Sequence, residues 1–261
     1  MIKNLNFYNA NKIKAPYPIA KVDHFIDKKS CRKLCMEIDK FSDFDDLVMN
    51  GRFRVNKGSD NFKKYLKNSP YLFSLFKKLN NKKTFLYMNN LLNKRNEEYL
   101  WYNEIKNYNF SENNYSEQSF NIFKILRRSG FISNFITPNI FLDMDFSKSK
   151  KGYFRTVHRD RDTRIISFLI YLNTISKKDG GQFQVFDVKK KTKNLQRFPN
   201  PKSVIEKKFF SPKSGQLFFF LSSPNSYHGV RKFLSKTKNR IFVYGSFTMD
   251  RKVNWKIKEK S

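Results

Sequence analysis

The feature that most constrains this sequence is a series of eight short β-rich segments between residues 139 and 248, with no helical pattern between them. Residues that favour turns, among them the pair Gly180–Gly181 and Gly215, separate these segments. Short strands at such spacing are typical of a β-sandwich or barrel, and favour a jelly roll. The predicted strands are Asn139–Asp145, Tyr153–His158, Arg164–Leu172, Gln182–Asp187, Ser203–Phe210, Gln216–Leu221, Ser226–Val230 and Arg240–Thr248.

Residues 1–125 have a different pattern, which predicts a mainly helical region. A strand is expected over Ile19–Phe25, followed by a helix that Asp27 or Ser30 caps and that runs to about Phe41. Further helices are predicted at Ser59–Lys67, Pro70–Leu79, Lys83–Lys94 and Ser116–Arg128. We therefore expect an α+β fold in a single domain, residues 1–261, with an N-terminal helical support region, 1–125, and a jelly-roll core, 133–250.

The charge of the chain is strongly positive, because 53 Lys and Arg outnumber 22 Asp and Glu to give a net charge of +31. Such an excess is compatible with a nucleic-acid partner. Most of these cations are lysines, however, and Lys, Asn, Phe, Ile and Tyr, all abundant here, are the residues of AT-rich codons. The charge therefore has two interpretations, a polyanionic partner or the base composition of the gene.

The sequence predicts neither a membrane segment nor a secretory leader. It contains no run of 18 apolar residues, and Met1–Asn11 is polar. The two cysteines, Cys31 and Cys35, are four positions apart in a helical pattern, which suits neither a zinc knuckle nor a redox pair. Reduced thiols packed on a helix, and a cytoplasmic location, are expected.

Two of the three histidines lie in the β-rich half and form a candidate metal site. His158 and Asp160 are two residues apart, so an extended strand directs both side chains to one face. His228 follows a predicted turn, where a second strand can return beside the first. Two histidines and one carboxylate form the facial triad of non-haem Fe(II). The alternative is a strand-end histidine paired with Asp160 and an unrelated turn histidine at position 228; His24 has no such pattern and is expected to be an ordinary side chain.

Several motifs surround this set in a fixed order. Tyr171-Leu172-Asn173 ends a predicted strand, Gly180-Gly181 precedes the next strand, and Pro212-Lys213-Ser214-Gly215 precedes a later one. His228-Gly229-Val230 follows, and Arg240 comes 12 positions after the histidine. In these motifs, over about residues 139–248, the sequence resembles the 2-oxoglutarate/Fe(II)-dependent oxygenases, specifically their prolyl-4-hydroxylase-like branch. The resemblance implies a double-stranded β-helix, the cupin-like form of the jelly roll.

The resemblance also implies roles for individual residues. Arg240 is at the position of the cation that pairs with the distal carboxylate of 2-oxoglutarate, and a guanidinium suits a carboxylate because it binds in a bidentate manner. Tyr171 is where some relatives donate a hydrogen bond to that carboxylate. Ser167, four residues earlier on the same strand face, is included in the predicted cofactor site. The implied Fe(II) ligands are His158, Asp160 and His228.

The implied activity is that of a dioxygenase using Fe(II), 2-oxoglutarate and O₂, with ascorbate as a supporting reductant. Retention of Asp160 favours hydroxylation, because related halogenases have a small residue there. Ser246 stands where nucleic-acid demethylases carry a second arginine, which argues against nucleic acid as substrate. A protein side chain, an amino acid, a sugar or another small molecule remains possible as substrate. The alternative class is a non-enzymatic, basic jelly-roll module that binds an anionic partner.

Overall fold

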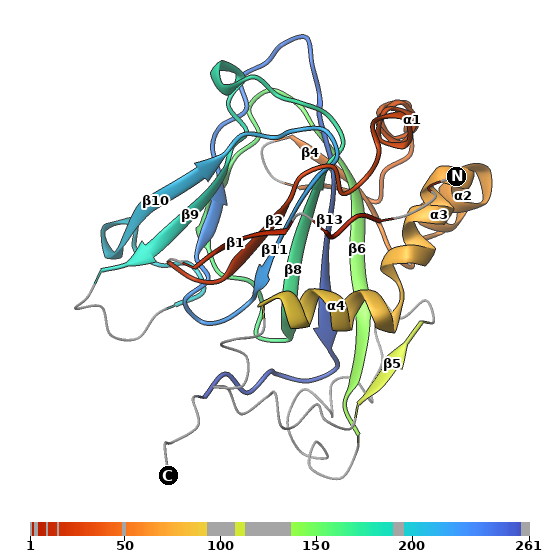
Figure 1. Ribbon diagram of the computed structural model, residues 1–261. Helices are drawn as coiled ribbons and strands as arrows, with labels where there is room; N and C mark the ends of the chain where they lie inside the picture. The colour runs from red at the N-terminus through yellow and green to blue at the C-terminus, as the bar shows by residue number, and fades with distance from the viewer. Residues whose placement is uncertain are drawn as a thin grey trace.

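The fold is built from two antiparallel sheets and a helical layer (Figure 1). The computed structural model describes residues 2, 5–8, 10–14, 16–48, 51–92, 108–112, 137–189 and 196–256. The α+β class expected from the sequence is confirmed. The predicted helix Ser116–Arg128 lies outside the described residues.

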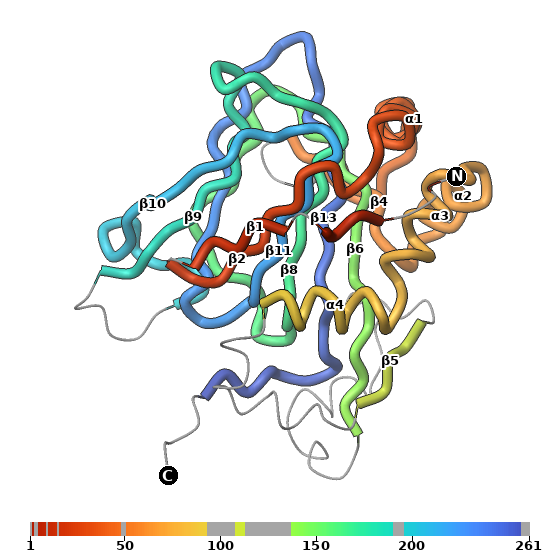
Figure 2. The backbone as a smooth tube through the Cα atoms, in the orientation of Figure 1, coloured from red at the N-terminus to blue at the C-terminus, as the bar shows by residue number. Residues whose placement is uncertain are grey.

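The larger sheet has nine strands and runs through the centre of the molecule. Segments far apart in the sequence pair in it: β2, near the N-terminus, lies beside β11 (Figure 2). Its order is β1 (Ala10–Ile13), β2 (Ile19–Val22), β11 (Gln216–Leu221), β8 (Arg164–Tyr171), β13 (Arg240–Met249), β6 (Asn139–Ser149), β4 (Arg52–Asn56) and β3 (Asp46–Val48), with β5 (Asn109–Ser111) parallel to β6.

The smaller sheet has four strands, in the order β10 (Val204–Phe210), β9 (Phe183–Val188), β12 (His228–Val230) and β7 (Arg155–His158). The pairing of β12 with the edge strand β7 places His228 directly opposite His158. Aromatic and aliphatic side chains of both sheets, such as Phe183 and Phe218, pack together in one buried cluster. The two sheets therefore face each other across a common interior.

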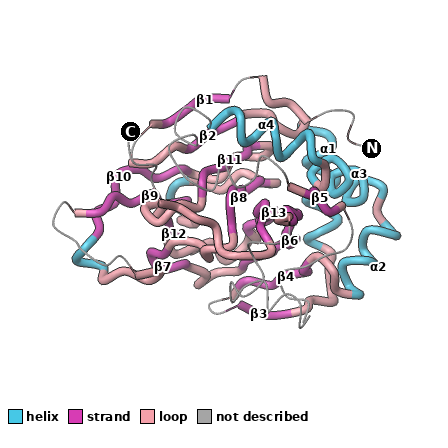
Figure 3. The backbone as a smooth tube through the Cα atoms, turned by 90° about the horizontal axis from the view of Figure 1, so that it is seen from below, coloured by secondary structure: helices cyan, strands magenta, loops and turns pink. Residues whose placement is uncertain are grey.

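Four helices cover one edge of the larger sheet and the face that points away from the smaller sheet (Figures 1 and 3). They are α1 (Lys28–Asp39), α2 (Asp60–Asn68), α3 (Pro70–Leu79) and α4 (Lys82–Leu92). Asp27, Ser59 and Ser69 cap the first three, each accepting a hydrogen bond from a backbone amide three residues ahead. These helices confirm four of the predicted ones: α3 has the predicted bounds, and the described ends of the other three differ by one or two residues. The last two residues of the predicted helix Lys83–Lys94 lie outside the described residues.

Alternation along the strands divides the larger sheet into two faces. On β8, Ile166, Phe168 and Ile170 belong to the core shared with the helices. Leu169 and Tyr171 belong instead to the cluster between the sheets. Strands buried on both faces explain the near-continuous apolar runs of the sequence, such as Phe218-Phe219-Phe220.

The eight predicted strands of the β-rich half are all present, as β6 to β13, although β7 and β12 are shorter than expected. The N-terminal region differs from the expectation of a mainly helical structure. Its described part also contains β1, β3, β4 and β5, which widen the larger sheet. Among the described residues, none of the helices combines the length and the apolar character needed to cross a membrane.

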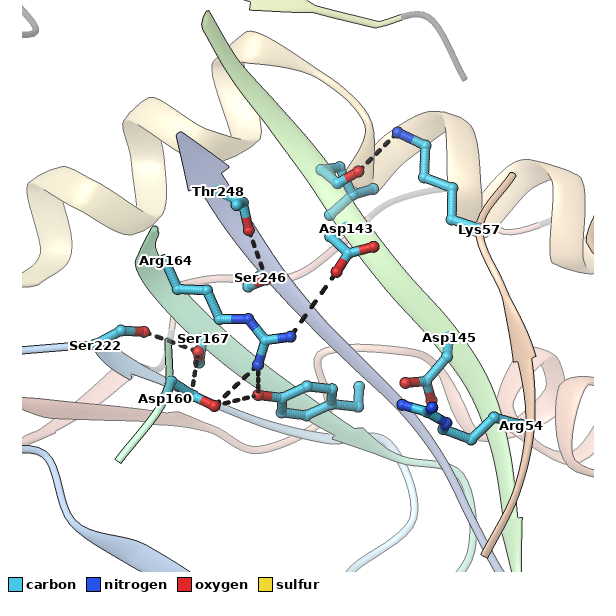
Figure 4. Close-up of polar contacts among 12 residues, drawn as sticks. Arg54, Lys57, Asp143, Asp145, Asp160, Arg164, Ser167, Ser222, Ser246 and Thr248 are labelled. Carbon is cyan, nitrogen blue, oxygen red and sulfur yellow. Dashed lines mark hydrogen bonds and ion pairs between the residues drawn. The ribbon is translucent and has the colours of Figure 1, made fainter. Parts of the chain in front are cut away.

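A buried lysine joins the helical layer to the sheet and gives a pH-dependent prediction. Lys57 is 1% exposed and its Nζ donates to the Leu142 carbonyl at 2.7 Å (Figure 4). Burial lowers the pKa of Lys57 to about 8, with Asp143 opposing the shift. The unfolded chain therefore binds more protons between this pKa and the ordinary lysine value, so this group makes the free energy of unfolding rise as the pH rises through that interval, by on the order of 3 kcal/mol.

Lys57→Met is expected to remove that rise and to stabilise the protein at neutral pH. The measurement is urea unfolding of both proteins at several pH values from 7 to about 10.5. The exposed lysine variant Lys63→Met is the control and should keep the pH dependence of the original protein. If the free energy of unfolding depends on pH in the same way for the original protein and for Lys57→Met, then burial does not lower the pKa of Lys57.

Candidate metal centre and active site

Three potential metal ligands meet between the two sheets. His158 ends β7, Asp160 follows two residues later, and His228 begins β12. One ligand atom from each lies within 4.8 Å of the other two, and all three side chains are buried. The antiparallel pairing of His228 with His158 brings the imidazoles to a centroid distance of 4.5 Å. The register of two short strands thus assembles the cluster that the sequence predicts.

Backbone carbonyls orient both imidazoles. Nδ1 of His158 lies 2.8 Å from the Thr156 carbonyl, and Nδ1 of His228 lies 2.9 Å from the Ser226 carbonyl. A carbonyl can only accept, so each Nδ1 carries the hydrogen and each Nε2 retains a lone pair. Metal-ligating histidines in proteins are usually held in this way. Both rings are therefore set in the tautomer that binds a metal through Nε2.

The two imidazoles are held in the neutral state that a metal requires. Burial, helped by the nearby His228, lowers the pKa of His158 to about 3. Burial likewise lowers the pKa of His228, although the Asp160 carboxylate opposes this shift. Neutral imidazoles at physiological pH can coordinate a cation without first losing a proton.

Asp160 is the carboxylate of the set and is surrounded by donors (Figure 4). Arg164 Nη1 and the Tyr244 hydroxyl each donate to Oδ1 at 2.9 Å. The Ser167 hydroxyl donates to Oδ2 at 2.5 Å and also contacts Ser222 Oγ at 2.8 Å. Burial by itself would raise the pKa of Asp160, but Arg164 and the two histidines lower it well below its ordinary value. The carboxylate is therefore ionised and fixed in orientation.

A cavity of about 300 Å³ opens beside the three ligand atoms. The inner faces of β4 and β6 contribute to it, as do the ends of β7 and β12. Its charged lining is mainly cationic. The lining arginines are Arg52, Arg54, Arg155, Arg161, Arg164, Arg197 and Arg240, and the lining aspartates are Asp143, Asp145 and Asp160.

Arg240 is a buried cation with unsatisfied donors inside this cavity. The residue is 1% exposed, yet its Nε and Nη1 have no hydrogen-bond partner. Nη2 donates to the Tyr171 hydroxyl at 3.2 Å, and the Phe242 ring centroid is 4.2 Å from Cζ. No described carboxylate lies within ion-pair distance of it. Because an uncompensated buried charge costs several kcal/mol, about 3–5 where a pair is broken, an anion is expected to bind here.

The residues fit both the metal and the co-substrate implied by the sequence. Two imidazole nitrogens and one carboxylate oxygen are the donor set that non-haem Fe(II) takes, with coordination positions left open. The unsatisfied nitrogens of Arg240, with the Tyr171 hydroxyl beside them, suit a carboxylate of 2-oxoglutarate. Both features line the one cavity, so metal and anion can be held together.

Gly181 makes room for Arg240, which gives a second prediction. Gly181 has a φ of +72°, and an added Cβ would lie 3.0 Å from Arg240 Cδ. Gly181→Ala is expected to displace the guanidinium and weaken 2-oxoglutarate binding about tenfold, with a stability loss of roughly 1–2 kcal/mol from the strained backbone. Gly152 is the matched control, since its φ is +98° but nothing lies within 4 Å of an added Cβ.

The measurement is anaerobic titration of 2-oxoglutarate together with urea unfolding. Gly152→Ala is expected to lose stability and keep its affinity for 2-oxoglutarate. If Gly181→Ala shows the same result as Gly152→Ala, then the close approach to Arg240 has no influence on the anion site.

The structure also places the residues predicted from the sequence and adds others. His158, Asp160 and His228 come together, as do Arg240 and Tyr171. Ser167, predicted with the cofactor residues, is directed at Asp160. Four residues along a strand span about 13 Å, which separates Ser167 from Tyr171 although both point to the same face.

The sequence reasoning did not identify the residues that complete the site on β4, β6 and β13. Asp143 and Asp145 face the cavity, and their signal is alternation with buried apolar residues on β6. Arg52 Nη2 lies 2.7 Å from Asp145 Oδ1, a pairing that only the register of β4 with β6 establishes. Arg164 and Tyr244 were likewise missed as partners of Asp160.

Comparison with known proteins agrees with this geometry. Residues 144–247 match the family model described as the 2OG-Fe(II) oxygenase superfamily. No curated protein matches the sequence.

Three solved structures are among those to which the chain is similar. A prolyl 4-hydroxylase from Phytophthora capsici has a TM-score of 0.50 and 14% identity, covering 88% of this chain and 58% of that one. A prolyl-4-hydroxylase from Pseudomonas putida has a TM-score of 0.41 and 17% identity over 88% and 91%. The viral collagen prolyl hydroxylase from Paramecium Bursaria Chlorella virus-1, solved as its 2OG complex, has a TM-score of 0.46 and 14% identity over 88% and 94%.

The two facing sheets and the His-Asp-His cluster define the class of a non-haem iron oxygenase. The family match includes both histidines, Asp160 and Arg240, and it indicates which group of such oxygenases this region resembles. Residues 144–247 of this chain are therefore similar to the 2OG-Fe(II) oxygenase superfamily.

Proposed function

We propose that the protein is a 2-oxoglutarate- and Fe(II)-dependent dioxygenase that hydroxylates a C–H bond of its substrate. The observation that carries the proposal is a single cavity lined by a His-Asp-His cluster and by a buried cation with two unsatisfied nitrogens, Arg240. A non-enzymatic binding module would need neither the neutral, oriented imidazoles nor this buried charge. The interpretation as an enzyme therefore explains more features of the site than the interpretation as a binding module does.

The metal and the co-substrate would supply the chemistry, and residues of the chain would position them. When bound, Fe(II), 2-oxoglutarate and O₂ supply an oxidation in which 2-oxoglutarate becomes succinate and CO₂ and one oxygen atom enters the substrate. His158, Asp160 and His228 would hold the metal through two Nε2 atoms and one carboxylate oxygen. Arg240 and the Tyr171 hydroxyl would bind the distal carboxylate of 2-oxoglutarate, so that its other end is directed toward the metal.

The residues around Asp160 would keep the metal ligand in place. Arg164, Tyr244 and Ser167 together use both carboxylate oxygens, which leaves the carboxylate ionised and unable to rotate freely. Such outer contacts typically tune metal affinity tenfold to about a hundredfold. We propose that Ser167 acts here as a positioning residue, and not at the co-substrate.

We also propose the type of β fold, the domain organisation and the cellular location. The two facing sheets support a double-stranded β-helix, the cupin-like jelly roll, over residues 133–250. The core shared by helices and sheet supports a single domain over residues 1–261, in which 1–125 is the supporting region. A cytoplasmic location is proposed because Cys31 and Cys35 are both free thiols.

The test is anaerobic addition of Fe(II) and 2-oxoglutarate, followed by exposure to O₂ with ascorbate. We expect a metal-to-ligand charge-transfer band in the visible region, and then slow formation of succinate. Absence of the band with correctly folded protein would overturn the proposal. Mass spectrometry for a gain of one oxygen, on prolyl peptides, amino acids and sugars, would then identify the substrate.

A further inference from the structure

We infer that the substrate carries an anionic group, a phosphate or a carboxylate, and that Arg155 and Arg197 bind it at the mouth of the metal cavity. The inference rests on the proposed function, because it assigns a substrate class to the same site. It comes from two cationic side chains that the metal and co-substrate do not use. Both line the cavity together with His158.

Backbone hydrogen bonds hold the two arginines next to the metal cluster. Arg155 begins β7, the strand that ends at His158. The segment carrying Arg197 runs beside the residues after this strand, since the Arg159 amide donates to the Arg197 carbonyl at 2.9 Å. Arg197 Nε also donates to the Arg159 carbonyl, at 3.4 Å. Two separate segments thus bring their guanidinium groups to one place.

An exposed aromatic ring lies beside both guanidinium groups. Phe198 is 51% exposed, and its ring is stacked on that of His158 at a centroid distance of 6.1 Å. The guanidinium carbons of Arg155 and Arg197 lie 5.8 Å and 5.1 Å from the Phe198 ring centroid. A molecule approaching the metal past Phe198 would therefore meet an apolar surface and two cations at once.

The electrostatics of the mouth favour an anion. Two other arginines of the cavity have acidic partners, since Arg52 pairs with Asp145 and Arg164 with Asp160. Among the described residues, neither Arg155 nor Arg197 has a carboxylate within ion-pair distance. Burial lowers the pKa of Arg197, and its cationic neighbours, Arg161 first and Arg155 among them, lower it further, while the Asp160 carboxylate opposes this shift. Two cations that contact one aromatic ring, neither of them in an ion pair with a described carboxylate, are stabilised by binding an anion.

This site is separate from that of the co-substrate. Arg240 is 1% exposed inside the cavity and is already assigned to one carboxylate of 2-oxoglutarate, whereas Arg155 and Arg197 are partly exposed. Guanidinium groups bind carboxylate and phosphate alike, so both anions belong to the inferred class. A substrate held by its anionic end at the mouth would present a neighbouring C–H bond toward the metal.

The test measures anion binding with the co-substrate site filled. The protein is loaded with Ni(II), which prevents turnover, and with saturating 2-oxoglutarate; inorganic phosphate and acetate are then titrated separately by calorimetry. We expect saturable binding of at least one anion, weakened by at least about tenfold in the double variant Arg155→Gln/Arg197→Gln. Arg231→Gln is the matched control and should bind as the original protein does, because Arg231 pairs with Glu206 outside the cavity.

The outcomes separate this inference from the proposed function. Stronger binding of phosphate than of acetate identifies a phosphorylated substrate, and the reverse identifies a carboxylic acid. Absence of saturable binding, or equal binding by the double variant, overturns the inference. The double variant should still give the charge-transfer band with Fe(II) and 2-oxoglutarate. Loss of that band in the original protein would overturn the proposed function, and would leave the anion result standing.

Discussion

Replacing His228 with alanine is expected to abolish succinate formation and to lower metal affinity by about a hundredfold or more. His228 supplies one of three ligand atoms, and even outer contacts to metal ligands are worth tenfold to about a hundredfold. The metal should also stabilise the original protein against thermal unfolding, because a ligand that binds only the folded state shifts that equilibrium. His228→Ala is expected to lose this stabilisation. The measurements are succinate production and melting temperature with and without Ni(II).

The third histidine provides the control. His24 lies outside the cluster and has a φ of +55°, a conformation that asparagine tolerates better than alanine does. His24→Asn should retain succinate formation and the metal-dependent stabilisation. If His228→Ala keeps the full thermal shift with Ni(II), then His228 is not a ligand and the facial triad is wrong.

Arg240→Met is expected to weaken 2-oxoglutarate binding by about a hundredfold or more, while metal affinity changes little. Truncating one partner of a buried, hydrogen-bonded charge pair costs roughly 2–5 kcal/mol or more. The same substitution should stabilise the protein in the absence of 2-oxoglutarate, by about 1–3 kcal/mol, because it removes an uncompensated buried cation and keeps most of its volume. Opposite effects on affinity and stability are expected of a binding residue that has no partner in the free protein.

The control for Arg240 is Arg231, an arginine nine positions earlier that pairs with Glu206 and does not line the cavity. Arg231→Met should leave both 2-oxoglutarate affinity and stability nearly unchanged. A loss of Ni(II) binding equal to the loss of 2-oxoglutarate binding in Arg240→Met would assign Arg240 to the metal site and contradict its proposed role.

Much of the fold could be predicted because its strongest signals are local. The strands β6 to β13 are bounded by turn residues, and Pro70 and the capping serines mark helix starts. The strands β3 and β4 were missed because Arg52–Asn56 carries polar residues on its inner face and so lacks a hydrophobic pattern. Its strand character depends on pairing with β6, more than 80 positions later in the chain.

The candidate site divides in a similar way. The spacing of His158 and Asp160 on one strand face and the turn before His228 are visible in the sequence, whereas Arg240 was assigned from the resemblance. The contacts of Asp160 with Tyr244, and of Arg52 with Asp145, join residues on different elements. They depend on strand register, which sequence spacing alone does not determine. The mouth formed by Arg155 and Arg197 was missed for the same reason.

The two faces of the larger sheet have a consequence for how such a protein can change. On β6, Leu142 and Phe146 join the helical core, while Asp143 and Asp145, from alternate positions, line the cavity. Substitutions on the cavity side therefore alter selectivity without loosening the hydrophobic core that supports the sheet. Evolution can adapt the chemistry on one face while the other preserves the scaffold, so new substrates can be acquired with little risk of losing the fold.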